Sequence, residues 1–67
     1  MRLFDEENQT GIRLSDSQAA KLKAAMDAGN IHDGCGDVLK WDEVIDGGGD
    51  IVLDELGYEE AKRAACA

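Results

Sequence analysis

The clearest pattern of apolar and polar positions lies between residues 15 and 29, where apolar residues recur at the three- and four-residue spacing of an α-helix. Ser15 followed by Gln18 forms a capping-box pattern at the start, and Gly29 supplies a left-handed stop at the end. The spacing therefore predicts a helix over 16–28. Its apolar face is expected to belong to the core and consists of Ala19, Leu22, Ala25 and Met26.

The N-terminal segment changes to a period of two, in which Ile12 and Leu14 alternate with Arg13. This alternation predicts two short strands, 2–5 and 11–14, joined by a polar turn. Because a lone hairpin is not stable in water, the hairpin must pack on the rest of the chain.

The segment 38–56 fits two patterns, and the first is helical. A helix over 38–46 would begin at an Asp37 cap and end at Gly47. Asp50 would then cap a second short turn. The inner face of the helix would hold Val38, Trp41 and Ile45.

The second pattern is a hairpin about residues 46–49, which the five β-branched residues of this segment favour. Such a hairpin would set Asp42 directly opposite Asp54 and turn Glu43 inward, and both arrangements are unfavourable. The helix over 38–46 is therefore the preferred prediction.

Around this segment lie a loop and a last helix. Residues 30–37, NIHDGCGD, predict the loop, and YEEAKRAA after Gly57 predicts the C-terminal helix. No linker, internal repeat or low-complexity segment is evident. The elements together predict a single domain over 1–67 of the α+β class, with an N-terminal β-hairpin packed on two or three short helices.

The size and apolar content of the chain set its class. A chain of 67 residues forms one domain with a thin core. The longest run of large apolar residues, 51–53, is far too short to span a bilayer or to form a signal-peptide core. We therefore expect a soluble protein of the cytoplasm.

Charge is distributed unevenly along the chain. Residues 1–29 carry five acids and four bases, whereas residues 33–60 carry ten acids and one base, Lys40, and the whole chain has a net charge of −8. Because burying an unpaired carboxylate is costly, the ten acids are expected to lie on the surface. They are the candidate partner-binding residues: Asp33, Asp37, Asp42, Glu43, Asp46, Asp50, Asp54, Glu55, Glu59 and Glu60.

Three explanations fit this excess of acid. Solubility or adaptation to a salty cytoplasm is the simplest, but the near-neutral charge of residues 1–29 argues against it. Weak cation binding is the second. The third is a basic partner, because carboxylates can occupy a groove of Lys and Arg built for phosphates. Trp41 and Tyr58 would anchor such an interface if exposed, although we expect Trp41 in the core. Direct binding to nucleic acid or to a membrane surface is excluded by the sign of the charge.

The stretch 45–58, IDGGGDIVLDELGY, has the composition of a calcium loop but not its register. An EF-hand loop needs oxygen ligands at positions one, three and five, Gly at six and Glu at twelve. With Glu55 at twelve, Val44 and Gly48 fall at positions one and five, and the frames that start at Asp42 or Asp46 also fail. We predict no metal site and no cofactor.

The thiols and the single histidine give no reactive site. Cys35 and Cys66 lack the spacing of a disulfide framework and are expected to be free, with a bridge between them as the alternative. Together with His32 they would give only three zinc ligands. No nucleophile is paired with a base, so we do not expect an enzyme.

With its small size, the acid run DGCGDVLKWDEVIDGGGDIVLDELGYEE (33–60) and its lack of catalytic residues, the chain resembles the small acidic inhibitors encoded by phages and mobile elements, in particular anti-CRISPR proteins that mimic DNA. This resemblance is one of type, because such inhibitors share no common fold and no motif. It implies a stoichiometric inhibitor, a monomer or weak homo-oligomer, in the cytoplasm of a host bacterium. Its partner would be the basic nucleic-acid-binding surface of a protein such as a CRISPR effector complex. The alternative is a small acidic metal (calcium)-binding or structural interaction module.

Overall fold

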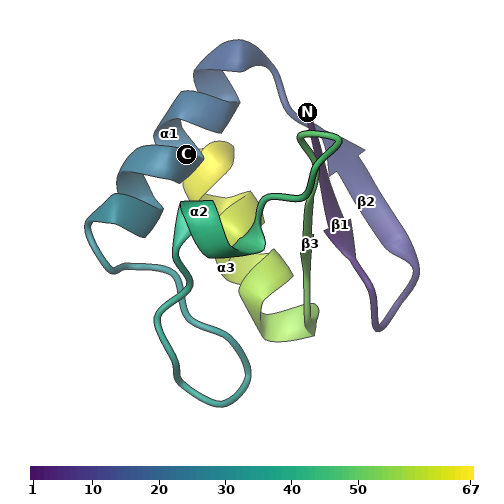
Figure 1. Cartoon of the computed structure of the whole chain (residues 1–67), viewed down its shortest axis with the longest axis vertical. Coiled ribbons are helices and arrows are strands. Elements are labelled where there is room, and N and C mark those ends of the chain that lie inside the picture. Colours follow the sequence, from purple (N-terminus) through teal and green to yellow (C-terminus); the bar gives the residue numbers. More distant parts are fainter.

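The computed structural model describes all residues from Met1 to Ala67 and has the predicted α+β architecture. A three-stranded sheet of order β2-β1-β3 is covered on one side by three helices (Figure 1). The elements are β1 (Arg2–Asp5), β2 (Thr10–Arg13), α1 (Asp16–Asp27), α2 (Trp41–Val44), β3 (Ile51–Leu53) and α3 (Glu55–Ala65). None of the helices has the length and apolar character needed to cross a bilayer.

The N-terminal hairpin is confirmed, with its second strand one residue earlier than predicted. Strands β1 and β2 pair antiparallel with Leu3 opposite Ile12. The turn between them is held by Asp5, which is 1% exposed. Its carboxylate accepts the backbone N–H groups of Glu7 and Asn8 and the Asn8 side-chain amide.

Helix α1 is confirmed together with its predicted cap. The Ser15 hydroxyl accepts the Gln18 N–H at 3.2 Å, and the Gln18 side chain accepts the Ser15 N–H at 2.9 Å. The helix ends at Asp27, and Gly29 has a φ of 77° in the left-handed region. Its apolar face meets the core through Leu22 and Met26, which are fully buried.

The segment 38–56 combines parts of both predicted patterns, and the preferred helix over 38–46 is wrong. Only Trp41–Val44 is helical, and the helix starts after Lys40 without a side-chain cap, not at Asp37. Residues 51–53 form β3, which runs parallel to β1 with Leu3 in register with Ile51. The hairpin alternative placed an extended segment here but paired it with 41–45, and the pairing with β1 was missed because β1, the central strand, lies at the other end of the sequence.

Helix α3 begins earlier than predicted. Asp54 is its N-cap, and the Asp54 carboxylate accepts the Gly57 N–H at 2.8 Å. Gly57 therefore lies inside the first turn and does not precede the helix. A Cβ at this position would stand 3.0 Å from the Leu39 side chain, so the absence of a side chain allows α3 to pack closely on the chain before α2.

The chain contains an internal repeat that the sequence prediction missed. The first Asp-Gly loop, 33–37 (DGCGD), and the second Asp-Gly loop, 46–50 (DGGGD), have the same backbone. In each, the first aspartate N–H donates to the carbonyl of the last aspartate, at 3.0 and 2.9 Å, and the glycine just before the last aspartate, Gly36 or Gly49, has a φ of 85° or 84°.

The side chains of the two loops repeat as well. Oδ1 of the first aspartate accepts the N–H groups two and four residues later, at 2.8 and 3.0 Å in the first loop and at 2.9 Å for both in the second. The flanking residues pair as antiparallel bridges, His32 with Val38 and Ile45 with Ile51. The acid and glycine content of this region therefore encodes one local structure twice.

The core lies between the sheet and the helices. It is thin, as the chain length predicts, and side chains from four of the six elements and from two connecting segments reach it. Its buried apolar residues are Leu3, Leu14, Leu22, Met26, Ile31, Ile51, Leu53, Tyr58, Ala61 and Ala65.

Candidate binding surface

Half of the ten predicted acids are occupied in holding the chain together. Their carboxylates accept backbone N–H groups of this protein. Asp33 and Asp46 close the two Asp-Gly loops, and Asp50 accepts the Arg2 N–H at 3.0 Å. Asp54 and Glu60 bind the segment that follows α1 to α3. A local structural role therefore accounts for part of the acid that the sequence concentrates in this region.

Two of these carboxylates position the loop that follows α1. The Asp54 carboxylate caps α3 with one oxygen and accepts the Gly34 N–H at 2.8 Å with the other. Glu60, one turn along α3, accepts the His32 N–H at 3.0 Å, and its Oε1 lies 3.4 Å from His32 Nδ1. The first Asp-Gly loop is thereby fixed against the beginning of α3.

The other five predicted acids accept no hydrogen bond within the chain, and all are exposed. Asp42 faces Lys23 of α1. The pKa of Lys23 is raised by its hydrogen bond to Asp27 at 2.9 Å, by the charge of Asp27, and by the charge of Asp42. These five acids with uncommitted oxygens are Asp37, Asp42, Glu43, Glu55 and Glu59.

Three segments far apart in sequence bring acids together at one end of the molecule. The Glu7 carboxylate accepts the Glu55 N–H at 3.1 Å, which joins the hairpin turn to α3, and the bond from Gly34 to Asp54 joins α3 to the first Asp-Gly loop. The segments 5–9, 33–37 and 54–55 contain no base. We call the surface-facing acids of these segments the acidic end: Glu6, Glu7, Asp33, Asp37, Asp54 and Glu55.

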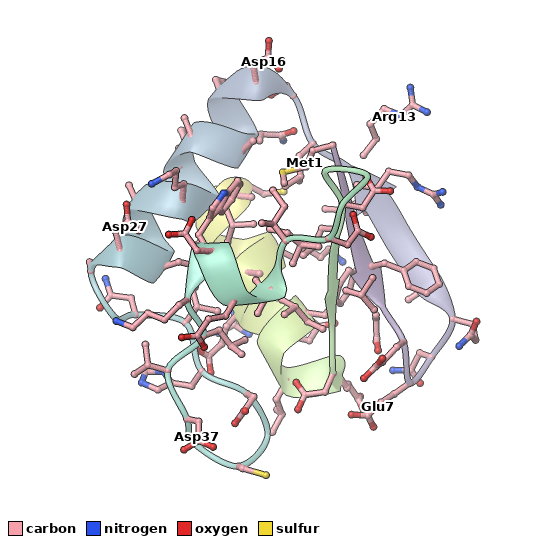
Figure 2. The ribbon with its side chains drawn as sticks, in the orientation of Figure 1. Met1, Glu7, Arg13, Asp16, Asp27 and Asp37 are labelled. Carbon is pink, nitrogen blue, oxygen red and sulfur yellow. The ribbon has the colours of Figure 1, made fainter.

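Bases lie at the opposite ends of the same elements. Strand β1 starts at Arg2, β2 ends at Arg13, and the last turn of α3 carries Lys62 and Arg63. Figure 2 shows Glu7 and Asp37 at one end of the molecule and Arg13 at the other. The acidic end is therefore free of these bases, whereas the opposite end carries bases together with acids such as Asp50.

The remaining predicted acids lie away from the acidic end. Asp46 and Asp50 are beside Arg2, at the opposite end of β3. Asp42 and Glu43 are on α2, and Glu59 and Glu60 lie further along α3. The structure thus gathers four of the ten predicted residues, Asp33, Asp37, Asp54 and Glu55, and separates the other six.

Sequence reasoning missed Glu6 and Glu7, because they fall outside the acid-rich run. The predicted hairpin could have indicated them, because Glu6 and Glu7 lie in its turn and the turn of a hairpin projects at one end of the sheet. The neighbouring Asp5 differs from them in being buried. Burial raises the pKa of the Asp5 carboxyl, but the hydrogen bonds from the Asn8 side chain and from the backbone of Asn8 and Glu7 outweigh burial, so its pKa lies below the ordinary value.

Two exposed apolar side chains lie at or beside the acidic end. Leu56, in the first turn of α3, is 56% exposed, and Val38, directly after the first Asp-Gly loop, is 39% exposed. The two aromatic residues considered as anchors, Trp41 and Tyr58, are less exposed than these apolar side chains. Tyr58 is 4% exposed and belongs to the core, so the exposure that its anchor role requires is not present, while Trp41 packs partly buried against the core as expected.

No group of three or more His, Cys, Asp or Glu side chains is arranged to hold a metal ion. His32 has one carboxylate neighbour, Glu60, and no nucleophile beside it. Cys35 and Cys66 are free and exposed, which confirms the predicted thiols and contradicts the alternative bridge.

No protein-family model, no curated protein and no solved structure matches this chain.

Proposed function

We propose that this protein is a non-enzymatic, acidic binding protein that occupies the basic nucleic-acid-binding surface of a partner protein and competes there with nucleic acid. The observation that supports the proposal is the acidic end, where six surface acids from three chain segments converge without a base. This is the mode of action of the DNA-mimicking inhibitors that the sequence resembles, and a CRISPR effector complex is the proposed class of partner.

The chemistry of carboxylates supports this choice of partner. An Arg side chain binds a carboxylate with the same forked geometry that it uses for a phosphate, so a surface built for a nucleic-acid backbone also accepts a row of acids. A net charge of −8 on a chain of 67 residues gives a strong attraction toward such a surface and a high association rate.

The fold supports a defined surface, because hydrogen bonds link the segments that carry it. Asp33, Asp54 and Glu7 each hold backbone N–H groups within or between segments, so the acids beside them are carried on a fixed frame. Leu56 and Val38 offer apolar contact beside these acids. Interfaces gain much of their affinity from such desolvated apolar contacts, while charges supply orientation and rate.

The experiment is a competition assay with guide-loaded CRISPR effector complexes of each major type and fluorescently labelled target DNA. We expect the protein to displace the DNA from at least one complex, with an apparent affinity that falls when salt is raised from 50 to 300 mM. Failure to displace DNA from any complex, or displacement that is unchanged by salt, would contradict the proposal.

A further inference from the structure

The two Asp-Gly loops are followed by extended segments that have different neighbours. After the second loop, Ile51 pairs with Leu3 of β1 and is fully buried. Val38 holds the equivalent position after the first loop, pairs only with His32 and is 39% exposed. The extended segment after the second loop is therefore paired with a neighbouring strand, β1, whereas the extended segment after the first loop has no such strand beside it.

The occupied copy shows how an extended segment binds. The Asp50 carboxylate accepts the Arg2 N–H at 3.0 Å, β3 then runs parallel to β1, and the Leu53 carbonyl accepts the Glu6 N–H at 3.0 Å. In this parallel register Ile51 bonds to the peptide groups on either side of Leu3, and the Leu3 N–H points to β2.

The first loop offers the same groups without a partner in the chain. The Asp37 carboxylate accepts no hydrogen bond. The bonds that flank the His32–Val38 bridge run from Asp33 to Asp37 and from Leu39 to Ile31, so the Val38 N–H and C=O point away from the bridge. Neither Val38 group has a hydrogen-bond partner, which leaves an open strand edge.

We infer that this edge, Asp37 to Lys40, is a docking site for an extended segment of a partner protein, which adds to it in parallel as β1 adds to the second copy. The Asp37 carboxylate would accept one peptide N–H of the segment, and Val38 would exchange two hydrogen bonds with it. The segment is basic, because the edge starts at the free carboxylate of Asp37 in the acidic end, while Lys40, the one base of the edge, lies at its other end. This basic character rests on the proposed function, whereas the extended conformation rests on the repeated loop.

The experiment uses the full chain, labelled with ¹⁵N, and an acetylated, amidated hexapeptide, Lys-Arg-Leu-Phe-Lys-Arg, which keeps the Arg-Leu-Phe of β1 between basic residues. We expect binding, with the largest change of amide signal at Val38. Methylation of the phenylalanine N–H, which would bond to the Val38 carbonyl, should weaken binding about tenfold. Methylation of the leucine N–H, which points away from the edge, is the matched control and should change affinity less than twofold.

Four results would overturn this proposal while leaving the proposed function standing. Equal affinity of both methylated peptides and the parent would show that charge alone holds the peptide. Signal changes along Thr10–Arg13 in place of Val38 would place the segment on the free edge of β2. Concentration-dependent change of the Val38 amide without any peptide would assign the edge to a second copy of this chain and overturn the partner segment. Absence of peptide binding would also overturn the site, and the DNA competition assay would then judge the proposed function independently.

Discussion

At the scale of single residues, acids with similar sequence surroundings have different roles. The Asp54 carboxylate caps α3 with one hydrogen bond and holds the first Asp-Gly loop with another, while the carboxylate of Asp37, at the end of that loop, accepts no hydrogen bond within the chain. Sequence alone predicted both at the surface. It could not separate them, because the partners of Asp54 include Gly34, a residue that only the fold brings near.

This difference predicts unequal effects on stability. Asp54→Ala should lower the free energy of unfolding by about 2 kcal/mol, since it removes a helix cap and leaves the Gly34 N–H without its acceptor. Asp37→Ala should change it by less than about 0.5 kcal/mol, as expected for a surface residue without partners. Urea denaturation of both variants measures this, and equal losses would contradict the assignment of roles.

The buried Asp5 predicts a pH effect of known sign. Its pKa in the folded protein lies below the ordinary value of 3.8, so the unfolded chain binds the proton first as the pH falls. The stability that this carboxylate supplies is therefore present at neutral pH and is lost as the pH falls below about 4. Asp5→Asn should be less stable than the wild type at pH 7, and the gap should narrow by pH 3. Thermal melting of both proteins across this range provides the measurement, and a gap that stays constant or widens would refute the role of Asp5.

At the scale of elements, the sequence predicted well those elements whose ends are fixed by residues close in sequence, and poorly those that depend on distant partners. Helix α1 was predicted nearly to the residue, because Ser15, Gln18 and Gly29 define its ends locally. The parallel pairing of β3 with β1 was missed, because the two strands lie 48 residues apart and the loop that directs β3 depends on Asp46 accepting the N–H groups of Gly48 and Asp50. The similarity of DGCGD and DGGGD was visible in the sequence, but only the equivalent β-bridges, His32 with Val38 and Ile45 with Ile51, show that the two segments have the same structure.

The second Asp-Gly loop predicts a difference between two neighbouring glycines. Gly49 has a φ of 84°, which an L-residue adopts only at a cost, whereas Gly47 lies outside this region and has open space around it. Gly49→Ala should lower the free energy of unfolding by about 1–2 kcal/mol, and Gly47→Ala should be nearly neutral. Chemical denaturation checks both, and a neutral Gly49→Ala would contradict the described backbone.

At the scale of the whole molecule, the fold redistributes the acids that the sequence concentrates in one run. The run 33–60 suggested one continuous acidic surface, but half of its acids bind the protein's own backbone, and Asp42 lies near the base Lys23. The acidic end arises instead from three segments, including Glu6 and Glu7 of the hairpin turn. Composition predicted how much acid the surface would carry, and only topology could predict where it gathers.

The central claim is that the location of the acid, beyond its amount, determines partner binding. Two triple variants separate the effect of the location of the acid from the effect of its amount, and each changes the net charge from −8 to −5. One removes charge at the acidic end (Glu6→Gln, Asp37→Asn, Glu55→Gln), and the other removes it elsewhere (Asp16→Asn, Asp27→Asn, Glu43→Gln). The pair is matched in helix position too, since Glu55 and Asp16 both lie in the first turn of a helix.

The decisive measurement is the affinity of these two variants for the effector complex from which the wild-type protein displaces DNA. With each exposed charge pair contributing about 0.2–1 kcal/mol, the acidic-end variant should bind about tenfold more weakly, and the matched variant should stay within about threefold of the wild type. Equal weakening of the two variants would contradict the account, because net charge alone would then explain binding.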